Sequence, residues 1–272
     1  MNTEQATEAL LSRAAAGDDA ALEALLEAVQ PQLYRFSMKM CRHSADAEDV
    51  LQDSLLAAAR SIRTFRGDAS VSTWLFTIAR RFCIKKRRKR AGAPDHEESL
   101  DALSPSEQQA LHDTAPTPHD AAESAEVWRV VQAAIATLPP DDREVLVLRD
   151  IEGLRAKEVA EVIGASVSAV KSRLHRARAK LREALAESPY RPDADCPDIR
   201  TIFSTYIEGD LSPEICTVME AHVETCPACA AECDGLKAAL NACSSAPCDV
   251  PQGVVDRVRE ELKRALDKTA SR

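Results

Sequence analysis

Apolar residues recur at helical spacing along almost the whole chain, and this periodicity constrains the fold more than any other feature. Leu22, Leu25, Leu26 and Val29, for example, follow the spacing of a single helix face. No strand-like alternation or hairpin dipeptide interrupts the pattern in later segments. Aromatic residues, which strands favour, make up only 4% of the 272 residues. The sequence therefore predicts an all-α protein.

Charge and proline content divide the chain into segments. Residues 91–125 carry eight acidic residues, four prolines and no Lys or Arg, which is typical of a flexible linker. Residues 1–90 have a net charge of +4, and residues 191–272 have a net charge of −6. We expect two basic domains on either side of the acidic linker, followed by an acidic C-terminal domain.

The cysteines point to metal or redox chemistry. No apolar run reaches 18 residues, and the N-terminus does not resemble a secretory signal, so we expect a cytoplasmic protein. Thiols stay reduced in that compartment. Seven of the nine cysteines lie between Cys196 and Cys248. This clustering favours a thiolate site over disulfide bonds.

The segment Ser44–Ile62 is predicted to form an amphipathic helix with an acidic stripe. Asp46, Asp49 and Asp53 are spaced so that they share one helix face. Acidic residues near the start of a helix are favoured by its dipole, so the stripe has an ordinary structural explanation. The alternative is a docking face for a basic partner.

Aromatic and basic residues are interleaved in the next segment, Arg63–Arg90. Trp74 and Phe76 precede residues 80–90, which contain eight Lys or Arg and no acid. Such a pattern suits single-stranded nucleic acid, whose phosphates attract the charges and whose bases stack on rings. The competing interpretation places the aromatic residues in the core and the basic run at a solvated helix end.

Residues 152–185 have the pattern of a helix-turn-helix. The first helix is predicted over Ala156–Ile163, with Gly164 at its C-terminus and Ser166 capping the second helix. Apolar residues Val167, Val170, Leu174, Ala177 and Leu181 share one face of that second helix. The opposite face carries Ser168, Lys171, Ser172, His175, Arg176 and Arg178. A polar, basic face of this kind can enter a DNA major groove, whereas a plain helical hairpin would not require it.

Four residues near the C-terminus have the spacing of a zinc site. Cys226 and Cys229 form a C-x2-C pair, and His222 lies four residues before Cys226, on one helix face. Cys196 is the natural fourth ligand for a tetrahedral ion. The surplus cysteines at 216, 233, 243 and 248 exceed what a structural zinc needs, and Cys216 and Cys233 are additional candidate ligands. Buried small apolar residues are the alternative explanation for each surplus thiol.

Two long segments of the chain resemble extracytoplasmic-function (ECF) sigma factors. The resemblance rests on DAEDVLQDSLLAA, FRGDASVSTWLFTIARR and LPPDDREVLVLRDIEGLRAKEVAEVIGASVSAVKSRLHRAR. It implies a σ2 domain at residues 10–90, a linker at 91–125 and a σ4 domain at 126–188, with a further domain at 192–272. It also implies a promoter-specificity subunit of RNA polymerase that is not itself an enzyme.

The same resemblance implies roles for individual residues. The face that docks on the polymerase β′ subunit would comprise Asp46, Glu48, Asp49, Leu51, Gln52 and Asp53. The residues that capture and melt the −10 element would include Arg63, Phe65, Arg66, Asp68, Trp74, Arg80 and Arg81. The −35 element would be read by Ser168, Lys171, Ser172, Arg173, His175 and Arg176. The long basic tail at Lys85–Arg90 departs from the family pattern.

The C-terminal domain resembles zinc-binding anti-sigma domains and the cysteine-rich domains of metal-responsive ECF sigma factors. We expect it to bind Zn²⁺ or another thiophilic ion such as Cd²⁺ or Cu⁺ and to regulate transcription, with the metal activating. The expected partners are the polymerase core, through its β′ and β subunits, promoter DNA and metal ions, without a membrane. The C-terminal domain has two alternative interpretations, a redox sensor and a purely structural zinc module. The alternative for the whole protein is a helix-turn-helix regulator that does not engage polymerase.

A final amphipathic helix is predicted near the C-terminus. Its apolar face comprises Val254, Val255, Val258, Leu262 and Leu266. We expect this face to pack either on the sigma domains or on the zinc module.

Overall fold

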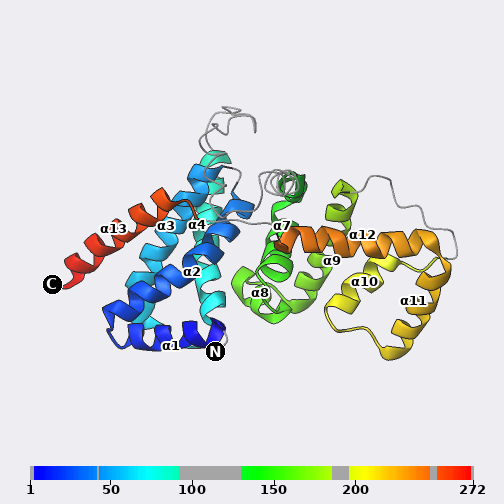
Figure 1. Ribbon diagram of the computed structural model, residues 1–272, viewed down its shortest axis with the longest axis horizontal. Helices are drawn as coiled ribbons and strands as arrows, with labels where there is room; N and C mark the ends of the chain where they lie inside the picture. The colour runs from blue at the N-terminus through cyan, green and yellow to red at the C-terminus, as the bar shows by residue number, and fades with distance from the viewer. Residues whose placement is uncertain are drawn as a thin grey trace, which may run out of the picture. The chain divides into compact units, whose positions relative to one another are not determined.

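The computed structural model describes residues 3–41, 43–65, 67–91, 130–185, 196–245 and 250–270. All regular elements within these ranges are helices, which confirms the predicted all-α fold (Figure 1). No helix in the described part of the chain has the length and apolarity needed to cross a membrane. The predicted linker at 91–125 lies, apart from its first residue, outside the described residues.

The chain forms two compact units. Unit 1 contains the described residues up to 91 together with residues 250–270, and unit 2 contains residues 130–185 and 196–245. The helices of unit 1 are α1 (Thr3–Ala15), α2 (Asp19–Met40), α3 (Ser44–Ser61), a 3-10 turn (Ile62–Thr64), α4 (Val71–Ala91) and α13 (Gln252–Ala270). The elements of unit 2 are helical residues 130–137, α7 (Pro140–Leu146), a π-helical turn (Val147–Ile151), α8 (Ala156–Ile163), α9 (Val167–Leu185), α10 (Ile199–Ile207), α11 (Pro213–Thr225) and α12 (Pro227–Ser245).

The core of unit 1 lies between α2, α3 and α4. Its largest buried side chains include Phe36 and Phe76, whose ring centroids are 5.1 Å apart. The burial of Phe76 shows that this aromatic residue stabilises the fold. Helix α2 begins where the Asp18 carboxylate accepts a hydrogen bond from the backbone N–H of Ala21 at 3.0 Å. Helix α3 packs against both α2 and α4, and Asp49 of its acidic stripe is exposed at the surface of the unit.

Helix α13 adds a segment from the far end of the sequence to unit 1. Val254, Val258 and Leu262 are buried, and the helix packs along α3 (Figure 1). The final helix therefore packs on the first basic domain, one of the two predicted positions. The side chain of Leu266 lies outside the described residues.

The helix-turn-helix of unit 2 has the predicted local geometry. Gly164 ends α8 with a φ of +69°, a left-handed value that favours glycine. The hydroxyl of Ser166 accepts a hydrogen bond from the backbone N–H of Ala169 at 3.1 Å and so caps α9. Two predictions for α9 were wrong: Val167 is exposed, and Arg178 is buried rather than on the DNA-facing side. Ion pairs with Asp150 and Glu208 explain why a charged side chain is stable there.

Helices α10 to α12 form the remainder of unit 2. Pro213 occupies the first turn of α11, as predicted. Helix α11 ends at Thr225, and Cys226 has an extended backbone before α12 begins. The prediction that His222 and Cys226 share one helix face was therefore wrong. The two residues stay close because the backbone N–H of Cys226 donates to the carbonyl of His222 at 2.9 Å.

Candidate functional site

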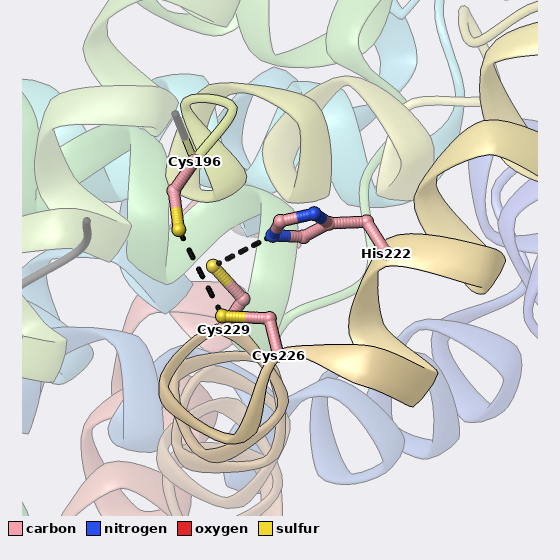
Figure 2. A group of neighbouring side chains, drawn as sticks. All are labelled: Cys196, His222, Cys226 and Cys229. Atoms are coloured by element: carbon pink, nitrogen blue, oxygen red, sulfur yellow. Dashed lines mark hydrogen bonds between the residues drawn. The ribbon is translucent and has the colours of Figure 1, made fainter. Parts of the chain in front are cut away.

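Four side chains from four positions of the chain converge in unit 2 (Figure 2). Cys196 lies just before α10, His222 lies in the last turn of α11, Cys226 follows that helix, and Cys229 lies in the first turn of α12. Their sulfur and nitrogen atoms all lie within 4.8 Å of one another. The structure thus brings together the four residues that the spacing indicated.

The distances within this cluster suit a tetrahedral thiophilic ion. The Sγ atoms of Cys196 and Cys226 are 3.8 Å apart, and the Nε2 atom of His222 is 3.3 Å from Cys229 Sγ. Four ligands at typical zinc distances would be separated by about 3.8 Å between sulfurs and about 3.6 Å between sulfur and nitrogen. A disulfide would need a separation of about 2.05 Å. Three thiols and one imidazole at these spacings can hold Zn²⁺, Cd²⁺ or a similar ion.

The thiols of this region differ in how readily they ionise. The backbone N–H of Cys229 donates to the sulfur of Cys226 and lowers the pKa of that thiol. Burial has the opposite effect on Cys233 and raises its pKa. Cys226 therefore ionises more readily than an ordinary thiol, and Cys233 ionises less readily.

The two additional candidate ligands lie outside the cluster. Cys233 packs against a buried apolar cluster that includes Ile199 and Met219. Cys216 is half-buried on α11, and neither thiol belongs to the group of convergent ligand atoms. Of the other surplus cysteines, Cys243 is buried and Cys248 lies outside the described residues. The packing of the partly buried Cys233 and the burial of Cys243 agree with the alternative interpretation of these thiols as small apolar side chains.

Two of the residues predicted to read DNA contact the segment around α10. The ammonium group of Lys171 donates to the carboxylate of Asp210, and the two side chains form an ion pair. The Nε2 atom of His175 lies 2.9 Å from the hydroxyl oxygen of Thr201. The sequence did not indicate these contacts. Asp210 lies 39 residues from Lys171, Thr201 lies 26 residues from His175, and no sequence motif links the members of either pair.

The other predicted DNA-reading residues of α9 face solvent or the adjacent helix α7. Ser168 and Ser172 are exposed. Arg173 pairs with Asp141 at 3.4 Å. Arg176 donates to the buried carboxylate of Asp142 at 3.1 Å and remains half exposed. Arg176 therefore connects α9 to α7 while presenting part of its guanidinium group to solvent.

A buried ion cluster attaches α10 to α9. Arg178 donates to Asp150 at 2.7 Å and to Glu208 at 2.8 Å, and also to the hydroxyl of Ser204 at 2.7 Å. Burial disfavours the charge of Arg178, but the hydrogen bonds and charges of Asp150 and Glu208 outweigh this effect and raise its pKa. Removing one partner of such a cluster is strongly destabilising, because a buried charge is left unpaired.

A second ion cluster joins α12 to α9 and α10. The carboxylate of Glu232 pairs with Arg182 of α9 at 3.3 Å and with Arg200 of α10 at 2.7 Å. Gly235 lies under the Arg182 guanidinium group, where an added Cβ atom would overlap with it. The helices that carry the metal-binding cluster are therefore packed closely against the helix-turn-helix.

In unit 1, the acidic stripe of α3 is paired with the basic end of α4. Lys86 forms an ion pair with Asp49 and lies 3.9 Å from the carboxylate of Asp46. The hydrogen bond to Asp49 is the main cause of a raised pKa for Lys86. Part of the basic run therefore faces the protein's own acidic helix. Leu51, which the resemblance also assigns to the polymerase face, is fully buried in the core of unit 1.

The residues predicted to engage the −10 element surround the start of α4. The rings of Phe65 and Trp74 lie with their centroids 5.1 Å apart, and both side chains are half-buried. Arg63, Asp68 and Arg81 are exposed and Arg80 is half-buried, whereas Arg66 lies outside the described residues. The half-buried aromatic pair combines a packing role with an accessible ring surface.

Three family models match successive parts of the chain. Sigma-70 region 2 matches residues 25–92, and sigma-70 region 4 matches residues 128–181. A putative zinc-finger family matches residues 196–230, the segment that contains all four clustered ligands.

Similar proteins include several ECF sigma factors. The ECF RNA polymerase sigma factor SigM of Mycobacterium tuberculosis is 33% identical over 182 residues, covering 67% of this chain and 86% of SigM. SigW of Bacillus subtilis is 31% identical, covering 63% of this chain and 92% of SigW. A chain of the solved structure of CnrH in complex with the cytosolic domain of CnrY is 27% identical and aligns with a TM-score of 0.48, covering 67% of this chain and 99% of that chain.

The first of these matches lies in unit 1, and the other two lie in unit 2. Both sigma regions are present, and relatives are matched over most of their length. The zinc-finger match follows the second sigma region. The chain therefore belongs to the ECF RNA polymerase sigma factors and carries a C-terminal zinc-finger domain of the anti-sigma type.

Proposed function

We propose that this ECF sigma factor is regulated by a thiophilic metal ion bound in its C-terminal domain. Membership of the family implies partnership with the RNA polymerase core and with promoter DNA. The metal would be Zn²⁺, Cd²⁺ or Cu⁺, held by Cys196, His222, Cys226 and Cys229. Such a protein acts in the cytoplasm, where both polymerase and promoters are found.

The sigma regions supply the proposed contact surfaces. The exposed carboxylates of α3 would dock on the polymerase β′ subunit, and the start of α4 would bind the −10 element. The polar face of α9 would read the −35 element, as expected of the second helix of a helix-turn-helix.

One observation carries the proposed regulation: the domain with the candidate metal ligands contacts Lys171 and His175, two residues that we propose to face DNA. Asp210 and Thr201 therefore compete with DNA for these two side chains. Cys196 lies two residues before Asp198, which caps α10, so a metal ion that fixes Cys196 also fixes the start of the helix that contacts α9. Metal binding and docking on α9 are therefore coupled.

The sign of this regulation follows from which arrangement the metal prefers. A ligand shifts an equilibrium toward the state that binds it more tightly. The ligand atoms are gathered while α10 is docked on α9, and we propose that the metal binds this docked arrangement more tightly than the released one. We therefore propose that the metal-loaded form is restrained and that loss of the metal releases α9, which reverses the activation expected from the sequence.

Redox control is the second candidate, and the separation of Cys196 and Cys226 favours it. At 3.8 Å, the two sulfurs are close enough to form a disulfide after a small movement. Oxidation by peroxide would remove two electrons from the two thiolates, reduce the peroxide to water and release the metal ion.

Run-off transcription with purified core polymerase distinguishes these proposals. Under strict anaerobiosis with reductant, removing the metal with a chelator should raise transcription from a cognate promoter by about 5- to 150-fold, the range of typical allosteric couplings. Adding Zn²⁺ back should lower transcription to its level before chelation. A response only to peroxide or diamide would favour redox control, and no response to either would leave the zinc purely structural.

The variant Asp210→Asn tests the contact on α9 without altering a metal ligand. It removes the charge that holds Lys171. We expect partial activation of transcription at unchanged metal content. Unaltered transcription would show that this contact does not restrain α9.

A further prediction concerns the −35 element. Arg176→Ala should weaken binding of a −35 duplex by about 1–3 kcal/mol and relax the preference at one base position, if this side chain reads a base. The fold should persist, because Asp142 keeps its ion pair with Lys180 at 3.2 Å. Fluorescence anisotropy with a set of single-base duplex variants measures both effects. A uniform loss across all sequences would instead assign Arg176 to a phosphate contact.

A further inference from the structure

The basic side chains of α9 fall into two rows that have different partners. Members of each row are three or four residues apart, so each row follows one side of the helix. The first row contacts the C-terminal part of unit 2 and comprises Lys171, His175, Arg178 and Arg182. The second row contacts Asp141 and Asp142 of α7 and comprises Arg173, Arg176 and Lys180. The second row is therefore held within the σ4 domain itself.

Asp142 is the buried carboxylate of this second row. Its side chain is 5% exposed, and each of its two oxygens accepts a hydrogen bond from a different residue of α9. Arg176 Nη2 donates to Oδ1 at 3.1 Å, and Lys180 Nζ donates to Oδ2 at 3.2 Å. The two donors are one helical turn apart. Because a buried carboxylate is stable only when it is paired, Asp142 holds both cations close to α7.

Arg176 is held by α7 and is also open to solvent. Its side chain is 51% exposed, although it is bonded to a buried carboxylate. A guanidinium group carries five N–H donors in one rigid plane, and the bond to Asp142 uses one of them. This bond restricts the rotamers of a long side chain, which lowers the entropy lost on binding. The exposed part of the group can then present two parallel donors, the arrangement that pairs with O6 and N7 of guanine.

We propose that Asp142 is a positioning residue for base recognition: it holds Arg176 so that the free donors of the guanidinium group read a guanine of the −35 element. The inference rests on the proposed reading of the −35 element by α9. Asp142 acts through Arg176 and makes no contact with DNA itself. Lys180 orients the carboxylate by binding its second oxygen. Because all three residues lie in the σ4 domain, this positioning does not depend on the metal ion.

The variant Asp142→Asn keeps the shape of the side chain and removes its charge. Arg176 and Lys180 are each about half exposed, so water can solvate them and the fold should persist. A bidentate contact discriminates between bases by about 5- to 150-fold, and we expect this preference to fall at least fivefold when Arg176 is released. Both cations also become available to phosphates. The dependence of non-specific binding on salt should therefore steepen by about one unit of slope on logarithmic axes.

The test uses full-length protein bound to core RNA polymerase and a pool of promoter duplexes randomised over the −35 segment. Sequencing the bound fraction gives the base preference at each position, and a salt series on a duplex of unrelated sequence gives the slope. The variants are Asp142→Asn, Arg176→Ala and the two combined. All are measured at the Zn²⁺ level at which the unaltered chain binds DNA more tightly, and circular dichroism verifies folding. Asp142→Ala replaces Asp142→Asn if the latter does not fold.

Glu161→Gln is the matched control, because it removes one acidic charge from an exposed position on α8 of the same domain. Support for positioning requires that Asp142→Asn lowers the guanine preference at the position where Arg176→Ala abolishes it. The control should keep that preference, and the combined variant should lose no more than Arg176→Ala alone, because the two residues act as one unit.

An unchanged preference in Asp142→Asn, or an equal loss at every −35 position, overturns the inference. Arg176→Ala separates the possible failures. If it loses the preference at one position while Asp142→Asn keeps it, α9 reads the −35 element as proposed and only the positioning is wrong. If Arg176→Ala keeps the preference at every position, the proposed base reading by Arg176 is wrong, and the role of Asp142 is rejected with it.

Discussion

Reversing the charges of Asp49 and Asp53 is expected to abolish binding to core RNA polymerase while unit 1 remains folded. Both side chains lie on the accessible side of α3, and Asp49 is 57% exposed. Truncating one partner of a desolvated charge pair in an interface costs about 2–5 kcal/mol. Reversal at two positions should therefore weaken the complex at least 100-fold, on the order of 3 kcal/mol or more.

The stability of the fold should change little in the same variant. The ion pair between Asp49 and Lys86 is at the surface, where such pairs contribute about 0–1 kcal/mol. Co-purification with core polymerase measures binding, and thermal unfolding measures stability. Glu8→Lys with Asp19→Lys is the matched control, because it makes the same charge change at exposed positions on α1 and α2. Equal loss of binding in both variants would attribute the effect to net charge and contradict the assignment of this face.

Local sequence signals predicted the helix-turn-helix and the convergence of the four candidate metal ligands well. Gly164 and Ser166 mark the turn through their own backbone conformation and hydrogen bonding, so neighbouring residues suffice to locate them. The C-x2-C pair brings Cys226 and Cys229 together within one turn of the chain, and His222 lies just before it. Features of this kind depend on short-range geometry.

Features that depend on distant partners were not predictable in the same way. Arg178 has the same helical position as other basic residues on the polar side of α9, but Asp150 and Glu208 neutralise it in the interior. Leu51 belongs to a segment that resembles a polymerase-binding motif, yet helix packing buries it. Likewise, the periodicity of α13 predicted an apolar face without identifying α3 as its partner. Each of these outcomes was decided by tertiary packing.

The largest change in the C-terminal domain is expected from Cys226→Ser combined with Cys229→Ser. This variant removes two of the four convergent ligands and should reduce the metal content of the purified protein from one ion per chain to none. The domain should also lose much of its ordered structure, because its buried apolar cluster is small and comprises Ile199, Met219 and Cys229. Binding of a structural zinc ion contributes about 10–16 kcal/mol in zinc-finger peptides, so folding here is coupled to the metal. Elemental analysis and circular dichroism measure the two effects.

Cys216→Ser with Cys233→Ser is the matched control, since it also replaces two thiols but leaves the cluster intact. Neither sulfur belongs to the convergent group, and burial raises the pKa of the Cys233 thiol. We therefore expect the control to retain one metal ion and its helical structure. Full metal content in the Cys226 and Cys229 variant would place the site elsewhere. Metal loss in the control would show that the surplus thiols are ligands and that the metal-loaded domain adopts a different arrangement around α11 and α12.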